Sequence, residues 1–222
     1  MRGLPRRDRL SAIINFSIVL MVITGVIVLF LRKVGDGKSL TTVGVKNIKY
    51  FTTQSNLLCG FVSAYYLVLR FGRKKKLSDA FVFLKLACTA TISITFLVTA
   101  FVLAPHYGYL RLYRGQGFLF HLVIPLLVIL DFCLLDTKEV RMKMRYTWMS
   151  IFPTLVYGIG YIWNLWRTGM TDQFPDPHDF YKFTTYGYNI GMLVFGGILI
   201  AAFVMACLFR HLNIRSNIRN RI

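Results

Sequence analysis

Six long apolar stretches constrain the fold of this chain more than any other feature of its sequence. They cover residues 10–31, 50–71, 79–104, 117–135, 146–167 and 187–209. A helix needs roughly 20 apolar residues to cross the hydrocarbon core of a bilayer, and each stretch is close to that length. A membrane β-barrel would instead show short segments of alternating hydrophobicity. The sequence therefore predicts an all-α polytopic membrane protein, with six transmembrane helices forming one domain over residues 1–222.

The rest of the chain leaves no room for a separate soluble domain. Of its 222 residues, 55% are hydrophobic, which is more than in an ordinary soluble domain. The first apolar stretch is longer than the core of a signal peptide, and the following sequence "FLRKVGDG" offers no small-x-small cleavage site. We therefore expect the first span to stay in the membrane.

The net charge of +18 gives information about topology. With six spans, 17 of the 27 Lys and Arg residues would lie on the side of the two termini and nine on the other side, while Lys85 falls within the third span. The positive-inside rule then predicts that both termini are cytoplasmic. Because the basic residues flank spans and form no folded basic surface, we expect no nucleic-acid partner.

The chain has four cysteines, and they are isolated from one another in the sequence. Cys59, Cys88, Cys133 and Cys207 all fall within predicted spans, and no C-x-x-C pair occurs. Single thiols in apolar helices behave as small hydrophobic side chains. We therefore expect neither a disulfide nor a metal cluster.

Several polar residues are predicted at one level, near the outer ends of different spans. On span two, Thr52, Ser55 and Asn56 share one helical face, and His121 lies four residues into span four. Polar groups within a membrane usually face the bundle interior or a wet cavity, which favours a site at this level. Hydrogen bonding between helices is the alternative explanation. Further residues at this level are Asn164 near the end of span five, and Tyr188 and Asn189 in the first turn of span six.

A hydroxyl and an imidazole at matched depth are sufficient for nucleophilic acyl transfer. The Thr52 hydroxyl would attack a carbonyl carbon while His121 takes its proton, and Asn amides or Tyr hydroxyls would hold the developing oxyanion. Thr53 is an adjacent rival nucleophile. Asp131 lies about 15 Å further along the helix of His121, too far to complete a triad. Lys85 lies at the depth of Asp131 on a neighbouring span, so we predict a structural contact between them.

Short motifs between residues 49 and 175 occur in a characteristic order. They are "KYFTTQSN" (49–56), "HLVIP" (121–125), "GYIW" (160–163), "TGM" (168–170) and "FP" (174–175). Together they resemble the androgen-induced family of intramembrane threonine hydrolases. They are most similar to the family's bacterial six-span relatives, which carry F-T-x-x-S/T-N in the second span.

The resemblance implies an integral membrane hydrolase of lipid esters, in the plasma membrane of a bacterial cell. The animal members hydrolyse fatty-acid esters of hydroxy fatty acids with a Thr and a His, which match Thr52 and His121 here. The partners would be a fatty-acyl ester substrate and membrane lipids, with no cofactor and no metal. Residues expected to bind substrate are Ser55, Asn56, Tyr161, Asn164, Tyr188 and Asn189.

The chain departs from the family pattern in three places. The His-to-Pro gap is one residue shorter than in the animal proteins, and the stretch from Met170 to Pro175 is one residue longer. Gln54, Ser55 and Asn56 replace mainly apolar residues. The catalytic pair is retained, while the acyl pocket is free to differ.

Two other functions fit parts of the sequence. His106, His121 and His178 are all predicted outside, with Asp172, Asp176 and Asp179 near the last, and three His can hold a zinc ion with an open water position. A non-enzymatic transporter or lipid-binding scaffold is the other alternative, since Pro125 and Pro153 would kink spans. A transport pathway would require polar residues at every level of one cavity.

Overall fold

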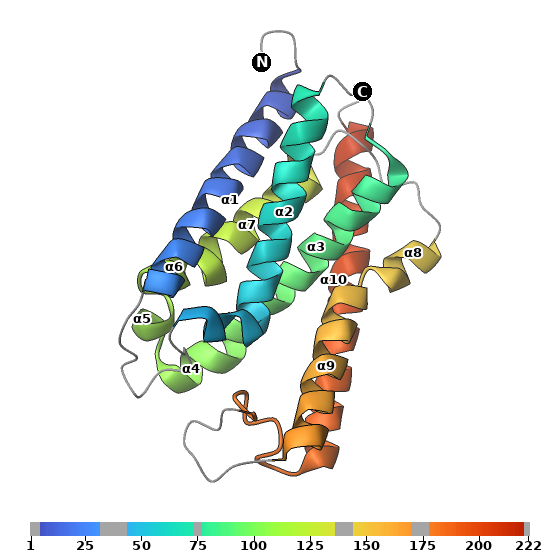
Figure 1. Cartoon of the computed structure of the whole chain (residues 1–222). Helices are drawn as coiled ribbons and strands as arrows, with labels where there is room; N and C mark the ends of the chain where they lie inside the picture. The colour runs from blue at the N-terminus through green and yellow to red at the C-terminus, as the bar shows by residue number, and fades with distance from the viewer. Residues whose placement is uncertain (1–4, 32–43, 73–76, 136–143, 170–177, 220–222) are drawn as a thin grey trace.

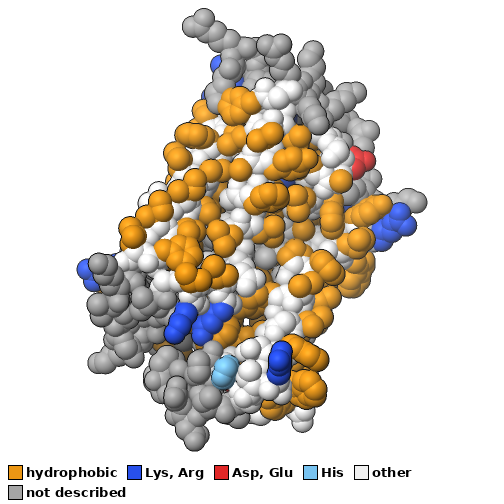
Figure 2. Space-filling model, viewed as in Figure 1, with side chains coloured by type: hydrophobic (Ala, Val, Ile, Leu, Met, Phe, Trp, Pro, Cys, Tyr) orange, Lys and Arg blue, Asp and Glu red, His pale blue; other side chains and the backbone are white. Residues whose placement is uncertain are grey.

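The computed structural model describes residues 5–31, 44–72, 77–135, 144–169 and 178–219, and it is helical with no strand among them (Figure 1). Four helices are long and apolar enough to cross a membrane: Arg6–Leu31, Asp79–Tyr107, Gln116–Leu135 and Tyr188–Arg219. Hydrophobic side chains cover most of the middle of the face in Figure 2, and Lys and Arg side chains lie toward its ends and edges. The prediction of an all-α fold is confirmed, and these four helices fit an integral membrane protein.

The helices of the described residues follow one another along the chain. The first half contains α1 (Arg6–Leu31), the 3₁₀ turn η1 (Gly44–Lys49), α2 (Phe51–Phe71), α3 (Asp79–Val98), the π-helical turn η2 (Thr99–Leu103) and α4 (Ala104–Tyr107). The second half contains α5 (Tyr109–Leu112), α6 (Gln116–Phe118), the π-helical turns η3 (Leu119–Val123) and η4 (Asp131–Leu135) around α7 (Ile124–Leu130), then α8 (Met144–Met149), α9 (Phe152–Thr168) and α10 (Tyr188–Arg219).

The long helices form a bundle in which α1 packs along α2, α2 along α3, and α3 against both α7 and α10 (Figure 1). Small residues permit close approach: a Cβ atom at Gly60 would lie 2.9 Å from the Val22 side chain. The start of α1 and the last turns of α10 lie at the same end of the molecule, where the Arg7 guanidinium donates to the Ser216 hydroxyl at 3.0 Å. We call this the terminal end of the bundle.

Two of the six expected spans, 50–71 and 146–167, are not among these four long apolar helices. α2 has 21 residues, as expected, but its first turns carry the polar run from Thr52 to Asn56. Expected span 146–167 is divided into α8 and α9 by a turn at Ser150 and Ile151. Pro153 is the second residue of α9 and has no N–H to donate to the carbonyl of Met149, so α8 cannot continue unbroken into α9. At 17 residues, or about 25 Å, α9 is shorter than the roughly 30 Å hydrocarbon core.

A buried charged cluster lies toward the terminal end. Lys85 Nζ donates to Asp131 at 2.8 Å, which confirms the predicted contact, and both side chains are buried. The same carboxylate accepts from the Ser11 hydroxyl and, at 2.8 Å, from the Asn15 amide. One turn nearer the end, Arg70 and Asp8 form a second ion pair. Buried charges are stable only when paired and hydrogen-bonded, and this carboxylate has three donors.

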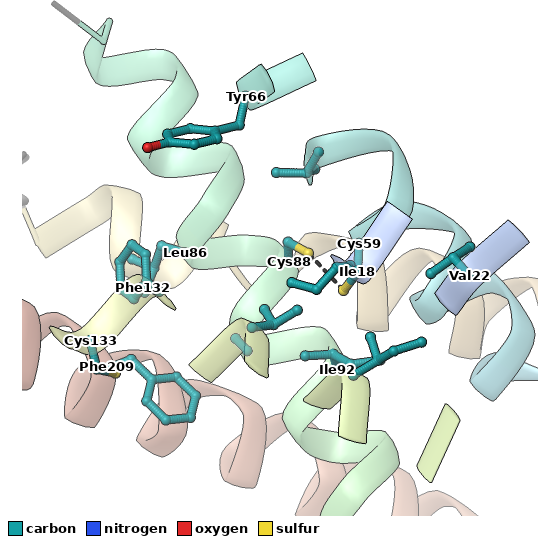
Figure 3. Packing of buried hydrophobic residues seen from close by; sticks show 14 of the residues in the cluster. Ile18, Val22, Cys59, Tyr66, Leu86, Cys88, Ile92, Phe132, Cys133 and Phe209 are labelled. Atoms are coloured by element: carbon teal, nitrogen blue, oxygen red, sulfur yellow. Dashed lines mark hydrogen bonds between the residues drawn. The ribbon is translucent and has the colours of Figure 1, made fainter. Parts of the chain in front are cut away.

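Buried hydrophobic side chains pack together inside the bundle (Figure 3), and we call five of them, from α1, α2 and α3, the apolar layer. The five are Ile18, Val22, Cys59, Cys88 and Ile92, all buried, and the two thiols lie 2.9 Å apart. From the sequence we expect isolated cysteines, but the packing of α2 against α3 brings Cys59 and Cys88 together as free thiols. Ile18 and Cys88 also line a small cavity beside Lys85 and Asp131, so the layer adjoins the charged cluster.

Candidate functional site

A cavity of about 870 Å³ lies at the end of the bundle opposite the terminal end, where α1 ends and α2 begins. The connection from η2 to η3 and the loop before α10 complete its wall. Among the described residues the charged side chains on this wall are Arg111 and Arg114. The other lining residues are Leu29, Asn47, Tyr50, Thr52, Thr53, Leu103, Tyr107, Leu110, Leu112, Tyr113, Gly115, Gln116, Gly117, Phe120, His121 and Tyr181.

Thr52 and His121 both line this cavity, from α2 and from the π-helical turn η3. No hydrogen bond joins the two side chains in the described structure. Catalytic hydrogen bonds are often long in a ligand-free site and shorten when a substrate is bound. The neighbouring Thr53 is buried and lines the same cavity, so it remains a rival nucleophile.

The imidazole of His121 has a defined orientation. Its Nδ1 lies 3.0 Å from the Leu112 carbonyl oxygen, which can only accept, so Nδ1 carries the hydrogen and Nε2 has a free lone pair. Gly117 makes this contact possible, because a Cβ atom there would lie 2.2 Å from the Leu112 oxygen. A neutral His with its Nδ1–H held by an acceptor is suited to act as a general base through Nε2.

Pro125 explains the local geometry around His121. In the preceding π-helical turn, the Ile124 N–H bonds to the carbonyl of Leu119, five residues earlier. The carbonyl of Phe120 would need the N–H of residue 125 in the same pattern, but proline has none. Asn56 supplies the missing donor: its Nδ2 lies 3.2 Å from the Phe120 oxygen.

Asn56 therefore connects the two candidate catalytic segments. Its Nδ2 also donates to the carbonyl oxygen of Thr52 at 2.7 Å, and the side chain is fully buried. One amide thus bonds to the backbone of Thr52 and to the residue preceding His121. Asn56 does not line the cavity, so the structure places it as a support behind the site.

A second proline leaves a carbonyl that a side chain from elsewhere satisfies. It lies in the segment that brings Leu103 and Tyr107 to the cavity wall. Pro105 follows the π-helical turn η2, and its missing N–H leaves the Ala100 carbonyl free. The Tyr109 hydroxyl donates to that carbonyl at 3.1 Å. This contact holds the short helix α5 over the end of the bundle.

The other residues expected to bind substrate do not line the cavity. Ser55 is buried and its hydroxyl lies 2.8 Å from that of Thr95, which is a contact between α2 and α3. Asn164 is half-buried on α9, and Tyr188 and Asn189 are exposed at the start of α10. Their proposed role in binding stays a prediction.

Tyr161 supports the loop before α10. Its hydroxyl donates to Asp179, whose carboxylate also accepts from the Thr184 hydroxyl and from the backbone N–H groups of Phe183 and Thr184. Burial alone would raise the pKa of Asp179, but these donors outweigh it and hold the pKa below its usual value. The loop is thereby folded around one carboxylate.

This loop contributes a wall residue that the sequence did not single out, Tyr181. Its hydroxyl oxygen accepts a hydrogen bond from the Phe51 N–H at 2.8 Å, at the first turn of α2. Tyr50, at the N-cap of α2, provides no side-chain cap, so the loop supplies the acceptor instead. A contact between residues 130 positions apart has no local sequence signal.

The three histidines of the zinc hypothesis do not form a cluster. Within the described ranges, no group of three His, Cys, Asp or Glu side chains is arranged to hold a metal ion. His106 is exposed and packs against Tyr107, while His121 lies inside the cavity wall. Asp172 and Asp176 lie outside the described residues.

The site is thus a cavity at one end of a helical bundle, with two Thr, an oriented His and two Arg residues on its wall. Comparison of the chain with protein-family models, with curated proteins and with solved structures finds no significant match.

Proposed function

We propose that the protein is an intramembrane lipid-ester hydrolase, with Thr52 as nucleophile and His121 as general base. The observation that carries this proposal is that both side chains line one cavity, with His121 Nδ1 bound to the Leu112 carbonyl so that Nε2 is free to take a proton. The motif resemblance to the androgen-induced threonine hydrolases supports the same pair. The substrate class is a fatty-acyl ester, whose acyl chain suits a cavity lined mostly by apolar and aromatic side chains.

In the first step, Thr52 Oγ1 forms a bond to the ester carbonyl carbon and its proton passes to His121 Nε2. The carbonyl π electron pair moves onto the oxygen. When that pair returns, the bond between carbon and the ester oxygen breaks, and the leaving alkoxide takes the proton from His121. Water then repeats the sequence on the acyl-threonine, releasing the carboxylic acid and restoring Thr52.

The topology proposed with this function has six spans and cytoplasmic termini. The four apolar helices, α2 and the α8–α9 segment would provide the crossings. The terminal end of the bundle then faces the cytoplasm, and the cavity opens at the level of the outer leaflet of a bacterial plasma membrane. The proximity of Arg7 and Ser216 supports an even number of crossings.

A transporter or lipid-binding scaffold remains the alternative function. A pathway requires polar groups at all levels of one cavity, but the large cavity shares no lining residue with the small cavity beside Lys85 and Asp131. Of the apolar layer, Ile18 and Cys88 line the small cavity, and none of the five residues lines the large one. Hydroxyls at intermediate depth, such as Thr89 and Ser93, donate to carbonyls of their own helix. This separation favours a site over a pathway.

Labelling with a fluorophosphonate probe tests the proposal. The purified full-length protein in detergent is compared with the Thr52→Ala, Thr53→Ala and His121→Ala variants. We expect the wild type and Thr53→Ala to be labelled, and Thr52→Ala and His121→Ala to be unlabelled. Absence of labelling in the wild type, or labelling that survives Thr52→Ala, would overturn the nucleophile assignment and favour the alternative function.

A further inference from the structure

Tyr181 lines the cavity and also bonds to the backbone beside the proposed nucleophile. It lines the cavity together with Thr52 and His121, and its hydroxyl oxygen lies 2.8 Å from the Phe51 nitrogen. Phe51 directly precedes Thr52 in the chain. The phenol oxygen is therefore held at the first turn of α2, beside the backbone of the residue that precedes the proposed nucleophile.

The hydroxyl proton of Tyr181 is available to a ligand. Its oxygen acts as acceptor toward Phe51, so that contact does not use the proton. Among the described residues, the other partner of this hydroxyl is Tyr157, which donates to the Tyr181 oxygen at the long distance of 3.5 Å, so this contact does not use the Tyr181 proton either. Tyr157 donates the same proton to the Lys49 carbonyl at the shorter distance of 2.7 Å. A carbonyl oxygen in the cavity could therefore accept the Tyr181 proton without replacing either contact of the Tyr181 oxygen.

The surrounding loop fixes the position of this hydroxyl. The Tyr181 N–H donates to the Tyr161 hydroxyl at 3.3 Å, and Tyr161 is bonded in turn to Asp179. The Tyr181 ring also packs against Tyr50 and Phe180. A donor held in place before the reaction loses little free energy to reorganisation when charge develops.

The ionisation state of Tyr181 also suits a donor. Burial raises the pKa of Tyr181 to about 12, so the hydroxyl keeps its proton at neutral pH. The phenol therefore remains neutral while the reaction proceeds.

We propose that Tyr181 is a catalytic residue that donates a hydrogen bond to the ester carbonyl oxygen as negative charge develops there. The inference rests on the proposed hydrolase function. When Thr52 Oγ1 adds to the carbonyl carbon, the π electron pair moves onto the oxygen, and the Tyr181 O–H stabilises it without transferring its proton. The pair returns when the bond to the leaving alkoxide breaks, and the Tyr181 contact weakens again.

The test compares the rate of fluorophosphonate labelling of wild type and Tyr181→Phe, since the phosphoryl oxygen of the probe occupies the position of the oxyanion. Phe keeps the ring and its packing and removes only the hydroxyl. We expect the second-order rate constant to fall by about 10²–10³-fold, as for other lost oxyanion donors. Tyr186→Phe is the matched control, because Tyr186 lies in the same loop but is 79% exposed, and its rate should equal that of the wild type.

The outcomes separate this inference from the proposed function. Because the Tyr181 oxygen also bonds to Phe51, rates are measured well below the lower of the two melting temperatures, so that partial unfolding does not contribute. A Tyr181→Phe rate within about twofold of the wild type, with labelling still dependent on Thr52, would overturn the role of Tyr181 and leave the hydrolase intact. A wild type that is not labelled would instead overturn the hydrolase proposal.

Discussion

The amide nitrogen of Asn56 donates to the carbonyl oxygen of Phe120 at 3.2 Å, and this contact joins α2 to the helix that carries His121. Phe120 needs an external donor because Pro125 cannot provide one. The same nitrogen bonds to the Thr52 carbonyl, so one side chain contacts the backbones of the segments that carry the proposed nucleophile and base.

Replacing Asn56 by Leu should therefore disturb both stability and activity. The change leaves the buried Phe120 carbonyl without a partner, which costs about 1–3 kcal/mol, and lowers the melting temperature in detergent. Labelling of Thr52 should fall because the two helices shift relative to each other.

The Pro125→Ala background provides the control for Asn56→Leu. Alanine restores an N–H at position 125 that can satisfy the Phe120 carbonyl within the helix. The loss of stability on Asn56→Leu should then be smaller than in the wild type. Equal losses in the two backgrounds, measured as a double-mutant cycle, would contradict the proposed link between Asn56 and Pro125.

Gly117→Ala should reduce activity by releasing His121. A Cβ atom at position 117 would lie 2.2 Å from the Leu112 oxygen, so the backbone must move and the bond to His121 Nδ1 must lengthen. We expect a lower rate of Thr52 labelling than in the wild type. The melting temperature should change less than it does in Asn56→Leu.

The matched control is Gly196→Ala on α10, where a Cβ atom would meet nothing within 4 Å. Alanine is a better helix former than glycine, so this variant should label at the wild-type rate and melt no lower. Equal labelling rates in Gly117→Ala and Gly196→Ala would show that the Leu112 contact does not orient the imidazole.

Single substitutions in the buried ion pair should be more harmful than the double substitution. Lys85→Met leaves the Asp131 carboxylate buried without its cation, at a cost of about 3–5 kcal/mol. In Lys85→Met/Asp131→Leu no buried charge remains, so the melting temperature should recover part of that loss. A double variant that melts below both single variants would contradict this account and indicate that the pair itself is required.

Acidification should loosen the loop that carries Tyr181. The pKa of Asp179 is held below its usual value, so its carboxylate contributes stability above the unfolded-state pKa of about 3.9. That contribution is lost as the pH falls through the lower pKa of the folded state. The near-ultraviolet circular dichroism of the packed tyrosines should therefore decrease below about pH 4. Asp179→Asn cannot titrate, so its spectrum should lack this step; an identical step in both proteins would assign the transition to another group.

The fold class and part of the site could be predicted because each has a local signal. Apolar runs of bilayer length predict long helices, and equal depth predicted the Lys85–Asp131 contact, which the structure confirms. The break before α9 could be inferred only in part, since Pro153 predicts a kink without giving its position. Tyr181 could not be found from the sequence because its role depends on a tertiary contact with Phe51. The Asn56 contact has a partial signal, the proline after His121, but its partner lies 64 residues away.

The apolar layer around Ile18, Val22, Cys59 and Ile92 has an electrical consequence in a membrane. The large cavity and the charges near Asp131 share no lining residue, and the buried aliphatic side chains of Ile18, Val22 and Ile92 offer neither a proton carrier nor an ion ligand. A hydrolase that releases acid at one face of a membrane with a proton gradient must not let protons leak through its own interior. In the proposed hydrolase, this layer would act as a dielectric between the two faces, and proton transfers at His121 would leave the membrane potential undisturbed.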